Sequence, residues 1–299
     1  LAVNPNDHRE YYLGVASGGV WKTENGGTTF EPIFDNEGSY SIGCVTIDPH
    51  NEHTIWVGTG ENNNQRSVAY GDGVYKSLDG GESWENMGLK ASEHIGEIVV
   101  HPDNPDIVYV AAYGPLWDAG GDRGLYKTTD GGENWEKILE VNKHPGINEV
   151  HLDPRNPEIM YACAHQRRRH VFTYVGSGPG SALYKSTDGG KNWRELKNGL
   201  PSSVKGRIGL DISPANPDYV YAIIEAKKDK EEGFYRSTNR GESWEKMSNY
   251  STSGNYYQEI IAGPHDKDKV FSMNTFLHHT EDGGKNFQKT GIDNKHVDD

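Results

Sequence analysis

A phrase of eight residues recurs six times along this chain of 299 residues. It begins with Ser or Thr, carries Asp or Asn two positions later, and ends on Trp or Phe, as in Ser77 to Trp84. The central positions, at intervals of 54, 51, 58, 51 and 43 residues, are Asn25, Asp79, Asp130, Asp188, Asn239 and Asp282. Repeats of about 40 to 50 residues that contain several short strands indicate the blades of a β-propeller.

Each copy of the phrase predicts a turn between two antiparallel strands. Its glycines supply positive φ, and its Asp or Asn can accept N–H groups of the reversing chain. The segment before the turn alternates apolar and polar residues, as in Val74, Tyr75 and Lys76, which is typical of a half-buried strand. We expect the closing aromatic residue, such as Trp84, to lie on the sheet of its own blade and to contribute about 2–3 kcal/mol by burial.

A second element, an apolar residue two positions before a proline, recurs in step with the first. Examples are Ile47 before Pro49 and Val100 before Pro102, each followed by another apolar strand. Proline cannot donate to a strand ladder, so it marks a turn. Each repeat is therefore strand, proline turn, strand, variable loop, strand, Asp turn, strand. We predict an all-β chain of about six four-stranded antiparallel blades within one domain, residues 1–299.

Both ends of the chain fall inside a repeat. The segment from Leu1 to Pro5 matches the end of a first strand, and Lys295 to Asp299 stand where another first strand would begin. Because an open propeller exposes sheet edges, we expect this domain to be an incomplete part of a larger propeller with further blades or domains.

The repeated phrase resembles the Asp-box, or BNR repeat, of sialidases, xyloglucan-cleaving hydrolases and VPS10 or sortilin-type propellers. The longer phrases Gly60 to Arg66 and Gln166 to Arg169 resemble bacterial VPS10-like proteins that are often labelled glycosyl hydrolases. The resemblance implies a periplasmic, cell-surface or secreted location. It also implies that ligands bind at the end of the blades opposite the Asp turns.

The composition and charge of the chain limit the kinds of molecule it is expected to bind. The formal net charge is −14, and the Lys and Arg residues are scattered, which argues against nucleic acid. No stretch approaches the 18 apolar residues that a membrane helix needs. No organic cofactor is expected. Calcium is the candidate metal, and Asp118 and Asp122 are its weak candidate ligands.

The loops between the second and third strands of each blade are unlike one another, so they are where function is expected. Three of them carry polar, aromatic or basic side chains suited to a sugar or a peptide. The predicted ligand-binding residues are Glu61, Asn63, Arg66, Tyr113, Trp117, Arg123, His165, Arg167, Arg168 and Arg169. Each set has an alternative role in holding its own loop or in ion pairs between blades.

Three functions remain open. The first is an extracytoplasmic propeller that binds a peptide, a protein or a glycan at the loop end. The second is a glycoside hydrolase, for which Glu61 and Asp118 are weak catalytic candidates. The other acids expected near the loop end are Asp72, Asp122 and Glu149. Xyloglucan-cleaving relatives carry an aspartate where this chain has Ser17, which favours binding without catalysis. The third is a structural module of a larger surface or secretion assembly.

Overall fold

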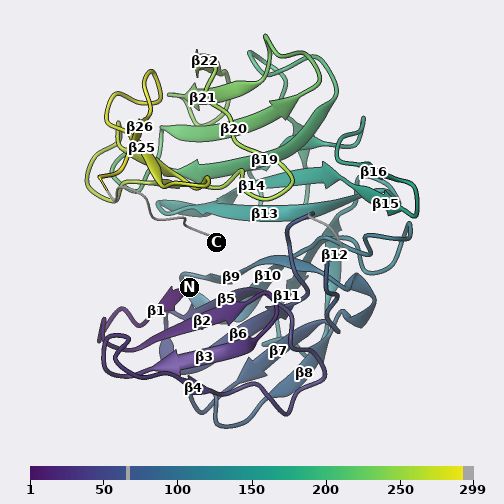
Figure 1. The fold of residues 1–299 in the computed structure, drawn as a ribbon, viewed down its shortest axis with the longest axis vertical. Coiled ribbons are helices and arrows are strands. Elements are labelled where there is room, and N and C mark those ends of the chain that lie inside the picture. The colour runs from purple at the N-terminus through teal and green to yellow at the C-terminus, as the bar shows by residue number, and fades with distance from the viewer. Residues whose placement is uncertain (65–67, 292–299) are drawn as a thin grey trace. The chain divides into compact units, whose positions relative to one another are not determined.

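The computed structural model describes residues 1–64 and 68–291, and these form an all-β chain (Figure 1). Their only helix is a single 3₁₀ turn, η1 (Lys90–Ser92). Six antiparallel sheets have four strands each, and a seventh has two. The chain divides into two compact units, which we describe separately: unit 1 comprises residues 1–62 and 68–150, and unit 2 comprises residues 63–64 and 151–291.

Unit 1 contains three four-stranded blades, in which neighbouring strands are consecutive in the chain. Blade 1 is β1 (Ala2–Val3), β2 (Tyr11–Val15), β3 (Gly19–Thr23) and β4 (Glu31–Pro32). Blade 2 is β5 (Ile42–Asp48), β6 (Asn51–Thr59), β7 (Val74–Ser77) and β8 (Glu85–Gly88). Blade 3 is β9 (Ile95–His101), β10 (Asn104–Ala112), β11 (Gly124–Thr128) and β12 (Glu136–Leu139).

The other three blades belong to unit 2, and the division between the units falls within the first strand of blade 4. Blade 4 is β13 (Pro145–Asp153), β14 (Asn156–Gln166), β17 (Ala182–Ser186) and β18 (Arg194–Glu195). The loop between β14 and β17 contains a two-stranded hairpin, β15 (Arg168–His170) and β16 (Thr173–Val175). Blade 5 is β19 (Lys205–Ile212), β20 (Val220–Ala226), β21 (Gly233–Ser237) and β22 (Glu245–Ser248). Blade 6 is β23 (Ile260–Ala262), β24 (Val270–Ser272), β25 (His278–Thr280) and β26 (Gln288–Lys289).

The prediction of six four-stranded antiparallel blades is thus confirmed. In every blade the Asp turn joins the third and fourth strands and the proline turn joins the first and second, so both turns lie at one end. A backbone N–H of each Asp turn donates to a carbonyl of the proline turn of its own blade. The donors, at 2.8–3.0 Å, are Gly26, Gly80, Gly131, Gly189, Arg240 and Gly283.

The Asp turns repeat one set of side-chain hydrogen bonds six times. In blade 3 the Thr128 hydroxyl donates to Asp130 Oδ1 at 2.6 Å and accepts from Gly132 N–H at 3.0 Å. Asp130 Oδ1 also accepts from Asn134 N–H at 3.0 Å. The corresponding hydroxyl bonds in the six turns span 2.6–3.0 Å. Each turn thus satisfies its own backbone donors, whichever blade it belongs to.

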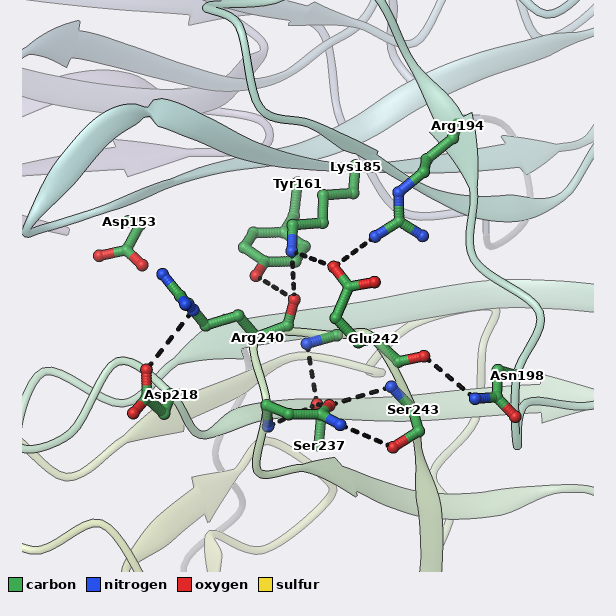
Figure 2. A network of polar contacts seen from close by, with 12 residues as sticks. Asp153, Tyr161, Lys185, Arg194, Asn198, Asp218, Ser237, Arg240, Glu242 and Ser243 are labelled. Carbon is green, nitrogen blue, oxygen red and sulfur yellow. Dashed lines mark hydrogen bonds and ion pairs between the residues drawn. The ribbon is translucent and has the colours of Figure 1, made fainter.

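Adjacent blades are joined by a cation placed over an aromatic ring. Lys185 lies opposite Tyr161 across strands β14 and β17, with its Nζ 5.6 Å from the ring centroid. In Figure 2 the Lys185 ammonium and the Tyr161 hydroxyl both donate to the Arg240 carbonyl in the Asp turn of blade 5, at 2.6 and 2.8 Å. Lys76, over Trp56, likewise donates to Gly131 of blade 3 at 2.9 Å.

The closing aromatic residues differ in part from the prediction. Trp84 and Trp135 donate their Nε1–H to Ile33 and Met87 carbonyls in the preceding blade, both at 2.8 Å. Trp135 also lies edge-on to Trp56 of that blade. These two rings therefore pack between blades and not on their own sheet alone, because each indole N–H finds its acceptor in the preceding blade. In the described part of the chain, no helix is long and apolar enough to span a membrane.

Candidate functional site

Three segments of unit 1 meet at the end of the blades opposite the Asp turns. They are the loop after β6, the connection between β8 and β9, and the loop after β10. Gly71 N–H donates to the Glu93 carbonyl at 2.7 Å, joining the first segment to the second. Asp122 accepts Ala91 N–H at 3.0 Å on its carboxylate and donates its own N–H to the Ala91 carbonyl at 3.1 Å, joining the second to the third.

Glu93 occupies the centre of this junction in a left-handed conformation, with φ 62°. Few residues other than glycine adopt positive φ, so the surrounding bonds hold this side chain in an unusual direction. Burial raises the pKa of the Glu93 carboxyl, and the negative charge of Asp118 raises it further, while Arg123 opposes the rise. Two carboxyl groups are therefore near enough for one charge to favour the protonated form of the other.

Arg123 holds the third segment together. Its guanidinium is buried, with 2% of the residue exposed, and it donates to backbone carbonyls. Its acceptors, at 2.5–3.1 Å, are Gly120, Tyr113, His144, Pro115 and Asp118. This arginine shapes the loop that contains Asp118, and its predicted contact with a ligand stays a prediction.

The two aromatic residues proposed for ligand contact have different environments. Trp117 is 47% exposed in the same loop as Asp118. Tyr113 is fully buried at the start of that loop, with no exposed surface. Only Trp117 offers an aromatic face on which a sugar ring or an apolar side chain could stack.

Three further predicted acids of unit 1 accept hydrogen bonds from residues near them in the chain. Glu61 accepts Ala69 N–H at 2.9 Å and so closes the loop after β6. Asp72 accepts the Tyr75 hydroxyl at 2.7 Å. Glu149 lies on β13 beside Asn148, whose amide donates to it at 3.4 Å. Arg66, also predicted to bind ligand, lies outside the described residues.

In unit 2 the basic cluster holds an Asn-rich segment. Arg167 is 1% exposed and donates from Nη1 to the Asn63 carbonyl at 2.8 Å and to Asn64 Oδ1 at 2.5 Å. Arg169 donates to the Asn64 carbonyl at 2.6 Å and lies 5.0 Å from the Tyr174 ring centroid. The structure thus brings Asn63 together with Arg167, through the Asn63 backbone carbonyl.

His165 and Arg168 complete this predicted set. His165 is fully buried, and its Nε2 lies 2.8 Å from the Gly176 carbonyl. Burial, with Arg167 and Arg207 nearby, lowers the pKa of His165 to about 3, so the ring is neutral at ordinary pH. Arg168 is half-buried on the hairpin of blade 4, whose tip residues Val171 and Phe172 are 96% and 87% exposed.

Calcium binding by Asp118 and Asp122 stays a prediction. Among residues 1–64 and 68–291, no three His, Cys, Asp or Glu side chains are grouped so as to hold a metal. Asp118 and Asp122 lie in one loop, and Asp122 already accepts Ala91 N–H.

Sequence reasoning missed Glu93, because it searched only the loops between second and third strands. Glu93 lies in a connection between blades, where its neighbours carry no repeated pattern. It also missed two buried groups of unit 2. Arg207, 2% exposed, forms an ion pair with Glu259 at 2.5 Å, and burial raises the pKa of Glu225 beside it. An acid within the otherwise apolar strand β20 was the available signal for Glu225, and an acid directly before β23 was the signal for Glu259.

The six four-stranded blades and their repeated turns define a β-propeller. Residues 18–144, 72–231 and 124–259 each match the model of the Sortilin-Vps10 family, described as sortilin, neurotensin receptor 3. The chain therefore belongs to the Sortilin-Vps10 family.

Two curated relatives are xyloglucan-cleaving enzymes. An oligoxyloglucan-reducing end-specific xyloglucanase of Emericella nidulans is 27% identical over 256 residues, 72% of this chain and 29% of the relative. A probable enzyme of the same name from Neosartorya fischeri is 26% identical over 312 residues, 88% of this chain and 36% of the relative. The chain thus spans about a third of the length of these relatives.

Solved structures share the fold at low identity. An ancestral GH74 enzyme matches 85% of this chain and 32% of its own, with a TM-score of 0.62 and 19% identity. The structure of YCF48 bound to D1 peptide matches 98% of this chain and 81% of its own, with a TM-score of 0.61 and 16% identity. These likenesses establish the propeller fold and nothing more specific.

Proposed function

We propose that this chain is part of a glycoside hydrolase that acts on a polysaccharide of the xyloglucan type, with Glu93 as its proton donor. The observation that carries the proposal is the carboxyl pair of Glu93 and Asp118 at the loop end of unit 1. Support comes from the curated relatives, which are xyloglucanases.

The pair meets the chemical demand of glycosidic cleavage. One carboxyl group must be protonated so that it can donate to the leaving oxygen, and another must be ionised to act as base or nucleophile. Burial and the Asp118 charge keep Glu93 protonated to a higher pH than an ordinary glutamate. Asp118 supplies the second carboxylate, and the exposed ring of Trp117 supplies a surface for a sugar.

Reducing-sugar release by the full-length protein from xyloglucan tests the proposal. We expect Glu93→Gln to lower kcat by at least tenfold with a smaller change in KM, because Gln keeps the shape but cannot donate the proton. Asp118→Asn should lower kcat similarly. Glu82→Gln, an exposed acid in the Asp turn of blade 2, is the matched control and should leave release unchanged. Unaltered release by both loop variants would disprove the assignment.

The pH profile gives a second readout. Because the pKa of Glu93 is raised, the protonated form is present below that pKa and is lost as pH rises through it. Activity should therefore fall on the alkaline side at a pH above the ordinary glutamate range. A profile whose alkaline limb is identical in wild type and Asp118→Asn would contradict the coupling of the two groups.

Ligand binding without cleavage is the second candidate. One observation favours it: a structure with the same fold is YCF48 bound to D1 peptide. The family resemblance adds that Ser17, at an exposed turn between β2 and β3, stands where xyloglucan-cleaving hydrolases are expected to carry an aspartate. Retention of the protein on immobilised xyloglucan with no sugar release would support glycan binding. Retention on peptides alone would support a peptide-binding propeller. A location outside the cytoplasm remains a prediction from the family resemblance.

A further inference from the structure

A pocket of about 490 Å³ lies at the loop end of blades 4 and 5 within unit 2. Three segments line it: residues 178–181 before β17, residues 195–197 at the end of β18, and residues 200–205 leading into β19. Its volume is within the range of about 300–1,000 Å³ that is usual for small-molecule sites. None of the residues predicted from the sequence to bind ligand lines this pocket.

Lys205 is the unusual member of the lining. Only 9% of this residue is exposed, and its carbonyl accepts Gly178 N–H at 3.2 Å on the wall of the pocket. Within residues 1–64 and 68–291, its ammonium group has neither a hydrogen bond nor an ion pair. Because Lys205 lines the pocket, an ammonium with no fixed partner there can pair with a bound anion, and burial of the rest of the residue makes such pairing favourable.

The neighbouring carboxylates are already engaged by other donors. Glu195, which lines the pocket, forms an ion pair with Lys197 at 2.8 Å. Glu231 accepts Ser203 N–H at 2.8 Å and forms an ion pair with Lys228 at 3.0 Å. Burial lowers the pKa of Lys205 even though both carboxylates act to raise it. The site is therefore short of one negative charge at bonding distance from the ammonium.

The rest of the lining suits a sugar ring. Pro179, Leu200 and Pro201 give apolar surface of the kind that packs against the C–H face of a pyranose. Ser181, whose oxygen accepts Gln166 N–H at 2.9 Å, and Ser202 bring hydroxyl groups to the lining. The pocket thus combines the Lys205 ammonium, the Lys197–Glu195 ion pair, hydroxyl groups and apolar faces.

We propose that this pocket binds a uronic acid, with the Lys205 ammonium pairing with the sugar carboxylate. A charge-assisted hydrogen bond to a carboxylate would supply the partner that the ammonium lacks. The choice of a sugar acid over another carboxylate rests on the proposed function, whereas the anion site rests on the pocket alone. The site is separate from the Glu93 pair and would recognise acidic side units of a polysaccharide.

Calorimetric titration of the full-length protein with D-glucuronate tests the proposal. Wild type should bind glucuronate at least tenfold more tightly than glucose, which lacks the carboxylate. Lys205→Met, which keeps the apolar stem, should lose this preference. Lys191→Met, an exposed lysine in the Asp turn of blade 4, is the matched control and should bind as wild type does.

Denaturant unfolding separates binding from folding. Lys205→Met removes a charge that burial disfavours, so the variant should unfold at the same or a higher denaturant concentration than wild type without ligand. Loss of binding by a variant that is equally stable would then reflect the ammonium itself. Equal glucuronate binding by wild type and Lys205→Met would overturn the proposal.

Two comparisons distinguish this proposal from the hydrolase proposal. N-acetyl-leucine carries a carboxylate on an apolar body, and binding as tight as that of glucuronate would overturn the sugar assignment. Glu93→Gln should bind glucuronate normally, and Lys205→Met should release sugar from neutral xyloglucan at the wild-type rate. Failure of either proposal is therefore visible without reference to the other.

Discussion

The two ends of the blades are held by different kinds of contact. At the Asp turns, one hydroxyl, one Asp or Asn and one backbone bond to the proline turn recur in all six blades. At the opposite end, Glu61 closes the loop of blade 2, Arg123 holds that of blade 3, and a hairpin fills that of blade 4. Contacts that every blade repeats serve the fold, and contacts that occur once are where a function particular to this protein is expected.

The test with the largest expected effect on stability replaces a tryptophan by alanine in each of the two regions. Trp56 is fully buried beneath Lys76 and beside Trp135, so Trp56→Ala should cost about 3–5 kcal/mol in the free energy of unfolding. Trp117 is half-exposed in the loop of blade 3, and Trp117→Ala should change stability by about 0.5 kcal/mol or less while weakening retention on xyloglucan. Urea unfolding and affinity electrophoresis measure the two effects. Similar stability losses at both positions would remove the distinction between the regions.

The second test asks whether the loop end depends on a single residue. Arg123→Met removes the donor to five backbone carbonyls, and it should cost at least about 1.5–3 kcal/mol, the contribution of one charged hydrogen bond. Limited proteolysis should then cut within residues 114–122, where the wild-type loop resists. Arg123→Lys restores the charge without the guanidinium fork, so it should recover only part of that resistance. Cleavage elsewhere first would contradict the role of Arg123 as the centre of this loop.

The sequence predicted the repeated half of the molecule well and the unlike half poorly, for a physical reason. The Asp turn depends on residues within eight positions of one another, so Ser77, Asp79 and the glycines between the strands specify it locally. Arg123 and Arg167 look in the sequence like exposed basic residues, yet both are buried on carbonyls that only the folded chain brings to them. Burial raises the pKa of Glu93, and Asp118, 25 positions away, raises it further, and local patterns reveal neither cause.

The third test removes one repeated contact. Thr128 is 1% exposed, and its Oγ1 accepts N–H groups of Gly132 and Asp130 at 3.0 and 3.2 Å. Thr128→Val keeps the shape of the side chain but leaves these two donors without an acceptor, at a cost of about 1–3 kcal/mol. Thr128→Ser keeps the hydroxyl, as in the Ser77 turn, and should cost less. Equal losses in denaturant unfolding for Val and Ser would mean that packing, not the hydroxyl, holds the turn.

The smallest expected effect is on the pH dependence of unfolding, which should differ between Asp turns that contain Asp and those that contain Asn. Hydrogen bonds from the Ser83 hydroxyl and backbone lower the pKa of Asp79 to about 2, whereas Asn239 fills the same position in blade 5 and does not titrate. A carboxyl with a lowered folded pKa adds stability above its unfolded value of about 3.9, and that stability is lost as pH falls toward 2. Asp79→Asn should therefore show a weaker dependence of unfolding midpoint on pH between about 4 and 2 than wild type. Because Ser243 already accepts the Asn239 amide, Ser83 can accept the amide that Asp79→Asn introduces in the same way, and the variant should retain the turn. The reverse change, Asn239→Asp, should make the unfolding midpoint more sensitive to acid than in wild type. Identical pH profiles for wild type, Asp79→Asn and Asn239→Asp would show that a carboxylate in these turns contributes nothing beyond what an amide provides.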